Sequence, residues 1–214
     1  NFFYFVAQEV RSLLARLGYR SLKDLVGRAD LLRYRKSAKL TKTADLDLTC
    51  LTDLPDTRRD RGWLEHGQVH SNGPVLDDEI LQDAEVQAAI AAQDSVCKTY
   101  SVVNTDRTVG SRVAGAIAAQ YGNSGFAGTL NLNFMGSAGQ SFGAFNLPCM
   151  TLTLTGEAND YVGKGMNGGE IIIKPSDDMT FDPSENVIVG NTCLYGATGG
   201  TLYALGQAGE RFAV

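Results

Sequence analysis

The sequence lacks the features that mark several protein classes. It has no apolar run near the roughly 20 residues of a membrane-spanning helix. Its apolar start is interrupted by Glu9, Arg11 and Arg16, which favours an amphipathic helix over a signal peptide. The four cysteines lie 44 to 52 residues apart, without the spacing of a zinc site or an iron–sulfur cluster. We therefore expect reduced core thiols in a cytosolic protein.

No complete catalytic or metal-binding motif is present either. There is no G-x-S-x-G nucleophile motif. His66 and His70 have a spacing that suits metal ligands on a helix, but no nearby cysteine supplies a third ligand, so we interpret them as loop histidines. Asp177, Asp178 and Asp182 are interpreted as solvated loop acids rather than a cation site. The sequence thus predicts no catalytic, cofactor-binding or metal-binding residue.

Charge and glycine are unevenly distributed along the chain. Residues 1–61 carry 13 Lys and Arg against 8 Asp and Glu, whereas residues 62–214 carry 6 against 16. Nineteen of the 24 glycines follow residue 100. A basic run from Arg28 to Lys42 could contact nucleic acid, but the pI is near 5.0 and the run contains a single aromatic residue, Tyr34. We interpret this run as a surface that docks on an acidic domain, with no nucleic acid and no membrane as partner.

The first hundred residues predict helices and an extended connection. Apolar residues at three- and four-residue spacing predict a helix from Phe5 to Leu17, and a short helix follows from Ser21. These two helices are too small to build a core by themselves. Residues 36–75 show little periodicity and predict an extended connecting segment that Trp63 anchors. A helix from Asp77 to Ile90 is expected next.

The second half predicts strands that end in a repeated glycine pattern. A strand over 99–104 and a helix over 110–122 come first, followed by the runs TLNLNFMG, MTLTLTG, GEIIIKP, NVIVG and TLYALG. These runs end at intervals of 20, 19, 15 and 16 residues. The glycines of the pattern, for which we expect a structural role only, are Gly136, Gly139, Gly143, Gly156, Gly163, Gly165, Gly168, Gly190, Gly196, Gly206 and Gly209.

This internal repeat predicts a mainly β fold, a right-handed β-helix with one strand per repeat, preceded by helical segments and an extended linker. Glycine suits tight turns that stack about 4.8 Å apart, because most other residues disfavour a positive φ. Gly190-Asn-Thr-Cys193-Leu-Tyr-Gly196 fits the pattern as a repeat that is one residue shorter than the others.

The stretch VGKGMNGG, residues 162–169, contains the dinucleotide-binding pattern G-x-G-x-x-G. That motif requires a helix to open at its last glycine, so that the pyrophosphate meets the helix N-terminus. Here the sequence EIIIKP follows, and its three β-branched residues and proline predict a strand. We therefore interpret these glycines as structural turns and not as a nucleotide site.

Several long motifs resemble the large subunits of glutamate synthases. FMGSAGQSFGAF, GEANDYVGKGMNGGEIIIKP, GNTCLYGATGG and AGERFAV are similar to the C-terminal glycine-repeat domain of that family. NTDRTVGSRVAGAIAAQYG resembles the start of that domain, and AQEVRSLLARLGYRSLKDLVGR the last helices of the FMN-binding barrel before it. The ferredoxin-dependent type is the most similar. The resemblance covers the chain from end to end.

The resemblance implies a parent oxidoreductase that converts glutamine and 2-oxoglutarate into two glutamates. An amidotransferase domain releases ammonia, which tunnels to a barrel with FMN and an iron–sulfur cluster. The family's β-helix implies a structural brace between those domains for residues 76–214, after barrel helices in residues 1–35 and a connection in residues 36–75. No catalytic, FMN or cluster residue of the family maps onto the glycine repeats.

The sequence therefore predicts a fragment that is inactive alone, binds no cofactor and ends within a repeat. The expected partners are the other domains of the same polypeptide and, for the parent, ferredoxin, in the cytoplasm or the plastid stroma. Two alternatives stay open. One is a subunit like that of formylmethanofuran dehydrogenase, which shares the glycine-repeat domain type. The other is a freestanding binding module, for FMN, NADPH or ferredoxin.

Overall fold

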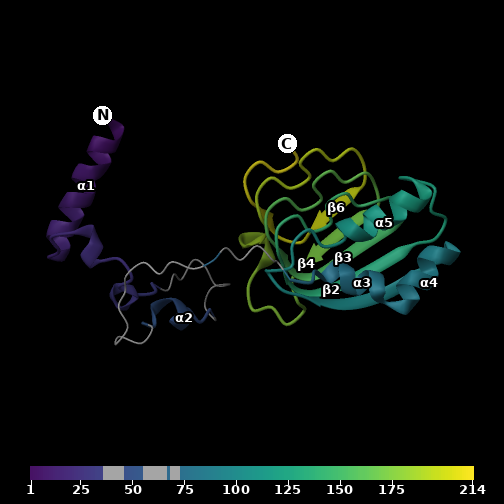
Figure 1. The fold of residues 1–214 in the computed structure, drawn as a ribbon, viewed down its shortest axis with the longest axis horizontal. Coiled ribbons are helices and arrows are strands. Elements are labelled where there is room, and N and C mark those ends of the chain that lie inside the picture. Colours follow the sequence, from purple (N-terminus) through teal and green to yellow (C-terminus); the bar gives the residue numbers. More distant parts are fainter. Residues whose placement is uncertain (36–45, 55–66, 68–72) are drawn as a thin grey trace. The chain divides into compact units, whose positions relative to one another are not determined.

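In the computed structural model the chain forms two compact units, Asn1–Val69 and His70–Val214 (Figure 1). No helix among the described residues is long and apolar enough to cross a membrane. Most of the expected connecting segment, with Trp63, His66 and His70, lies outside the described residues, as does the end of the basic run. The residues that the structure describes are 1–35, 46–54, 67 and 73–214.

The first unit contains one long helix and several short helical turns. Helix α1, Phe2–Leu17, confirms the expected helix and ends at Gly18, whose φ of 80° allows a left-handed cap. The Ser21 side chain accepts a hydrogen bond from the Lys23 amide, but the segment that it caps is only a short 3-10 helix. None of the described residues of this unit is buried. The shorter elements are η1 (Leu22–Asp24), η2 (Ala29–Leu31) and α2 (Thr49–Thr52).

Three helices of the second unit precede most of its strands. The expected helix over 77–90 is in fact two helices, α3 (Leu76–Gln82) and α4 (Ala84–Ala92). Asp83 separates them because its backbone is extended, with ψ 122°, and its side chain caps α4. Helix α5, Ser111–Tyr121, confirms the third expected helix and ends at Gly122.

Seven strands form one sheet, in which every pairing is parallel. The order along the main path is β1-β2-β3-β4-β6, of which Figure 1 labels β2, β3, β4 and β6, while β5 pairs with β3 and with β7. The expected strand runs are confirmed as β1 to β6. The strands are β1 (Val96–Val102), β2 (Leu130–Ala138), β3 (Met150–Ala158), β4 (Glu170–Lys174), β5 (Val187–Val189), β6 (Thr201–Ala204) and β7 (Gln207–Ala208), with the 3-10 helix η4 (Pro183–Glu185) before β5.

The predicted fold class, a mainly β right-handed β-helix, was wrong. The second unit is an α/β fold, in which α3, α4 and α5 accompany a seven-stranded parallel sheet. The prediction of one strand per repeat was also wrong, because Glu170 of β4 pairs with Thr201 of β6, 31 residues later. Strand β5, which lies between them in the sequence, pairs with β3 instead. The glycine spacing indicates where neighbouring segments approach closely, but it does not determine which strands pair or how many helices cover them.

The core lies on one face of the sheet. Inward side chains of β2 and β3 alternate with polar outward ones, so Leu132, Phe134 and Leu152 are buried while the residues between them are not. Ile80 of α3 and Ile117 of α5 belong to the same buried cluster. The helices therefore cover the inner face of the sheet.

The loops after the strands also stack by backbone hydrogen bonds between repeats. The Gly163 amide donates to the Phe142 carbonyl at 2.9 Å, and the Leu194 amide donates to the Val162 carbonyl at 2.7 Å. Leu194 thus occupies the position of Gly163, although its φ of 60° is unusual for leucine. The repeat over 190–196 is accordingly shifted against the expected frame.

Gly190 shows the same shift. Its amide donates to the Ala158 carbonyl at 3.1 Å, just as the Asn159 amide donates to the Ala138 carbonyl at 3.1 Å. Gly190 therefore corresponds to the middle position of the pattern and not to its first glycine. The first position is better seen in Gly136 and Gly156, which are register partners in β2 and β3.

Candidate functional site

Residues 162–169, which contain the G-x-G-x-x-G pattern, lead directly into strand β4, as expected, and not into a helix. Two of its glycines, Gly165 and Gly168, lie against side chains of the preceding loop. A Cβ at Gly165 would lie 2.6 Å from the Phe145 ring, and one at Gly168 would lie 2.6 Å from Cγ of Pro148. Protein atoms therefore fill the space beside these glycines that a phosphate group would need.

The other candidate residues are dispersed. Asp177 lies 3.8 Å from Lys174 as an exposed ion pair. Asp182 accepts hydrogen bonds from the amide and hydroxyl of Ser184 at 2.9 and 2.7 Å, and so begins η4. Among the described residues, no three His, Cys, Asp or Glu side chains come together in a way that could hold a metal ion.

The cysteines do not fit the cluster that the resemblance implies for the parent enzyme. Cys50 and Cys97 are exposed, Cys149 is half-buried and Cys193 is buried, so only part of the expectation of core thiols is met. Cluster ligands are thiolates, and burial raises the pKa of the Cys149 and Cys193 thiols. Neither these cysteines nor the glycine loop, with its packed Phe145 and Pro148, fits an iron–sulfur cluster or the phosphate of FMN.

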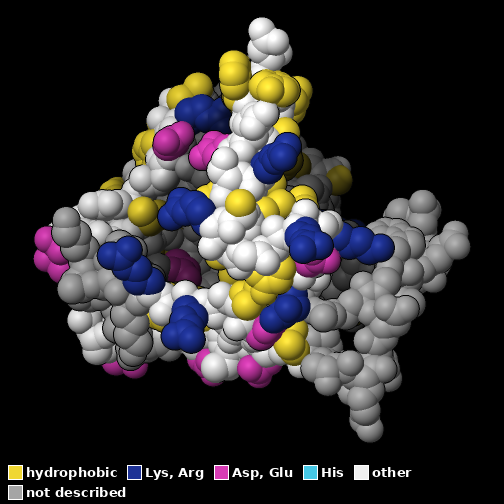
Figure 2. All heavy atoms as spheres, turned by 90° about the vertical axis from the view of Figure 1, so that its left-hand side faces the viewer, with side chains coloured by type: hydrophobic (Ala, Val, Ile, Leu, Met, Phe, Trp, Pro, Cys, Tyr) yellow, Lys and Arg dark blue, Asp and Glu magenta, His cyan; other side chains and the backbone are white. Residues whose placement is uncertain are grey.

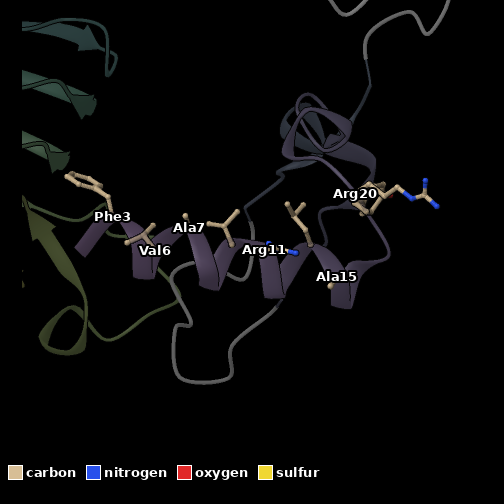
Figure 3. A pocket seen from close by; sticks show the side chains of 9 residues that line it. Phe3, Val6, Ala7, Arg11, Ala15 and Arg20 are labelled. Atoms are coloured by element: carbon tan, nitrogen blue, oxygen red, sulfur yellow. The ribbon is translucent and has the colours of Figure 1, made fainter. Parts of the chain in front are cut away.

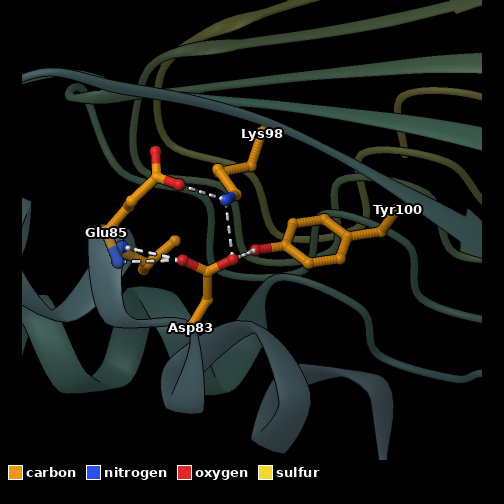
Figure 4. A network of polar contacts seen from close by, with 5 residues as sticks. Asp83, Glu85, Lys98 and Tyr100 are labelled. Carbon is orange, nitrogen blue, oxygen red and sulfur yellow. Dashed lines mark hydrogen bonds and ion pairs between the residues drawn. The ribbon is translucent and has the colours of Figure 1, made fainter.

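A polar network that the sequence did not reveal joins the break between α3 and α4 to strand β1 (Figure 4). Lys98 of β1 lies 2.9 Å from both Asp83 and Glu85. The Tyr100 hydroxyl donates to Asp83 at 3.4 Å, while the Asp83 carboxylate also accepts from the Glu85 amide. The hydrogen bond from Lys98 holds the pKa of Asp83 below its usual value, and burial raises the pKa of Tyr100 to about 12.

Substitution of Asp83 by asparagine is expected to flatten the loss of stability in acid. Since the pKa of Asp83 is lowered in the folded state, its charge stabilises the fold above the unfolded-state pKa of about 4, and this contribution disappears as the pH falls through the folded pKa. Asparagine still caps α4 but cannot pair with Lys98 as an anion. Urea unfolding midpoints from pH 7 to pH 3 measure the effect.

Glu85→Gln provides the control for this prediction, because Glu85 contacts the same Lys98 but has a side chain that is 73% exposed. Its acid profile should follow that of the unchanged protein. An Asp83→Asn profile that also follows the unchanged protein would show that the network does not contribute to acid stability.

A second carboxylate, Asp77 of α3, is buried and serves the start of α5. Its two oxygens accept hydrogen bonds from the amides of Gly110 and Arg112, both at 2.7 Å. Burial raises the pKa of Asp77, while these amides oppose the shift. The neighbouring Asp78 faces outward and pairs with the Arg112 guanidinium. Asp77 thus supplies an anion to the positive end of the α5 dipole from a different helix.

In the first unit, one face of α1 is apolar and open (Figure 3). A groove of about 450 Å³ runs along it, lined by residues that include Phe3, Val6 and Leu14 with Arg11 and Arg20. Figure 2 shows hydrophobic side chains interspersed with Lys and Arg. An amphipathic helix of this kind buries its apolar face against another surface. Within the described part of this unit no residue is buried, so such a surface is not provided there.

Comparison with known proteins places these observations in a family. Ferredoxin-dependent glutamate synthase 2 of Synechocystis sp. is 67% identical over 214 residues, all of this chain and 14% of the relative. Ferredoxin-dependent glutamate synthase 2, chloroplastic, of Arabidopsis thaliana is 55% identical, and the Pyropia yezoensis ferredoxin-dependent glutamate synthase is 52% identical. The chain thus spans 13–14% of the length of these relatives.

The resemblance to glutamate synthases is therefore confirmed over the whole chain. Residues 77–214, which contain the glycine repeats, match the family that is described as the GXGXG motif. This match begins within α3 and includes the whole sheet. The chain belongs to the GXGXG motif family.

Proposed function

We propose that these residues are part of a ferredoxin-dependent glutamate synthase, which forms glutamate from glutamine and 2-oxoglutarate. The observation that carries this proposal is the identity of 52–67% to enzymes of that name over the complete chain. FMN and an iron–sulfur cluster belong to other parts of such an enzyme on this proposal. Ferredoxin is the electron donor, because each of these relatives is named for it. None of them is a formylmethanofuran dehydrogenase.

Within that enzyme, the glycine-repeat unit acts as a rigid brace between the amidotransferase and synthase domains. Three features support this role: the apolar core, the parallel sheet and the loops that stack by backbone hydrogen bonds. Such packing keeps a fixed shape. The repeat glycines from Gly136 to Gly209 serve this packing and not chemistry. Residues 1–35 complete the FMN barrel, where the apolar face of α1 is covered.

The cellular location follows from the same relatives. The Arabidopsis thaliana enzyme is named chloroplastic, and a plastid stroma therefore suits this chain if it comes from a eukaryotic phototroph. The cytoplasm suits it if it comes from a cyanobacterium, which is the source of the 67% identical relative.

The brace is tested by the coupling between glutamine hydrolysis and glutamate formation. The 214-residue chain alone should form no glutamate from glutamine, 2-oxoglutarate and reduced ferredoxin.

In the full-length enzyme, Gly156→Ala should distort the sheet, so that glutamine is still hydrolysed but ammonia escapes and less glutamate forms per glutamine. Gly115→Ala, in the exposed part of α5, should leave this ratio unchanged. A ratio that is equally unchanged in Gly156→Ala would rule out the brace.

A further inference from the structure

The outward face of the parallel sheet is flat and regular. Residues of β1, β2, β3, β4 and β6 that point away from the core stand in register across the strands. They form three rows, which are Cys97, Asn131, Thr151, Glu170 and Thr201; Thr99, Asn133, Thr153, Ile172 and Tyr203; and Ser101, Met135, Thr155 and Lys174.

This face differs from the inner one because none of its fourteen residues is buried. Parallel sheets are normally covered on both faces, and here the buried cluster, with Ile80 of α3 and Ile117 of α5, lies on the inner face. Met135 is 51% exposed and Tyr203 is 54% exposed, and Tyr203 is the register partner of Ile172 on the adjacent strand. The outward face therefore exposes the pair Ile172 and Tyr203, together with Met135, among threonine, serine and asparagine side chains.

The charge on this face is low for a solvated surface. Of its fourteen residues only Glu170 and Lys174 are charged, and both lie on β4. Solvated surfaces carry roughly 25–35% charged residues. The core of a protein interface is instead depleted in charge and enriched in tyrosine and methionine. The composition of the face thus fits an interface with a partner that is itself weakly charged.

We infer that the outward face of the sheet is the docking surface for another domain of the same polypeptide. The occupant is a flat, weakly charged surface with hydrogen-bonding groups, which lies outside these 214 residues. The relatives provide such residues, because this chain covers only 13–14% of their length. This inference rests on the proposed brace and specifies the surface through which it acts.

Cys97 provides a natural probe of the face, because it lies in the first row and is exposed. Maleimide labelling of Cys97, followed by mass spectrometry of its peptide, is compared between the 214-residue chain and the full-length enzyme. Labelling in the full-length enzyme should be slower by about tenfold or more, since access limits the reaction of a thiol. Equal rates in the two proteins would overturn the inference.

A control cysteine decides whether the protection belongs to this face. Ser124→Cys lies in the exposed turn after α5, outside the three rows, and should label at the same rate in both proteins. Equal slowing at Cys97 and at this position would overturn the assignment. If Cys97 in the isolated chain became more protected as the chain concentration rose, the occupant would be a second copy of the chain. That result would also overturn the inference.

A substitution on the face should remove the protection. Tyr203→Arg places an unpaired charge in the proposed interface and should speed Cys97 labelling in the full-length enzyme by about fivefold or more. Tyr195→Arg is the matched control, since Tyr195 is 52% exposed but lies in a loop outside the rows. An equal effect of both variants would contradict the inference. None of these measurements requires turnover, so protection of Cys97 could persist even if the coupling test failed.

Discussion

Gly156→Ala is expected to lower the free energy of unfolding by about 3–5 kcal/mol, combining backbone strain with overpacking. Gly156 has a φ of 147°, and a Cβ there would lie 1.8 Å from the carbonyl oxygen of Gly136 on the neighbouring strand. Because that oxygen belongs to backbone inside the sheet, no rotamer change can relieve the contact. The strands would have to separate. Urea unfolding followed by circular dichroism measures the loss.

Gly115→Ala is the matched control, with an effect of opposite sign. Gly115 lies inside α5, and a Cβ there would meet nothing within 4 Å. Alanine should therefore raise the free energy of unfolding by about 0.5–1 kcal/mol, through its better helix propensity. If Gly156→Ala unfolded at the same urea concentration as the unchanged protein, the close approach of β2 and β3 at this register would be refuted.

Asp77→Ala should lower the free energy of unfolding at pH 7 by about 2–4 kcal/mol, because it leaves two amide donors without an acceptor. These are the amides of Gly110 and Arg112 at the start of α5. Asp77→Asn keeps one acceptor and should lose about half as much, roughly 1–2 kcal/mol. Chemical denaturation of the three proteins gives the comparison.

Asp78→Ala is the control for the burial of Asp77, since the adjacent Asp78 pairs with Arg112 at the surface. Its loss should stay below about 1 kcal/mol, as for other exposed ion pairs. Asp77 and Asp83 differ in how acid changes their contribution to stability. Burial raises the pKa of Asp77, so protonation of Asp77 increases the free energy of unfolding as the pH falls towards the unfolded-state pKa. Protonation of Asp83, whose folded-state pKa is lowered, decreases it. Equal losses for Asp77→Ala and Asp78→Ala would contradict this account.

Local pattern predicted the elements of the second unit better than their arrangement. Alternating residues such as Thr151, Leu152 and Thr153 specify a strand with one buried face wherever it is placed. The pairing of Glu170 with Thr201 depends instead on the segment between β4 and β5, whose sequence does not show which strand the chain joins next. The fold class was therefore wrong although the strands were found.

The polar sites were missed for a related reason. Asp77 and the amides that it binds are 33 and 35 residues apart, and Asp83 and Lys98 also meet only through the fold. One local signal for Asp83 was available, because an aspartate before Ala84 and Glu85 suits a helix N-cap. No signal could place Leu194 at a positive φ in the position of Gly163, since leucine rarely adopts that backbone.

The stacked hydrogen bonds between repeats have a consequence for how this unit can change in evolution. Gly136 and Gly156 stand side by side although 20 residues separate them in the sequence. Insertion of one residue within β2 or β3 would therefore shift this register and move the following side chains of that strand to the opposite face of the sheet. An insertion between β4 and β5 would leave the register of β2, β3 and β4 unchanged. Changes of length are therefore expected in the loops of this unit and not within its strands.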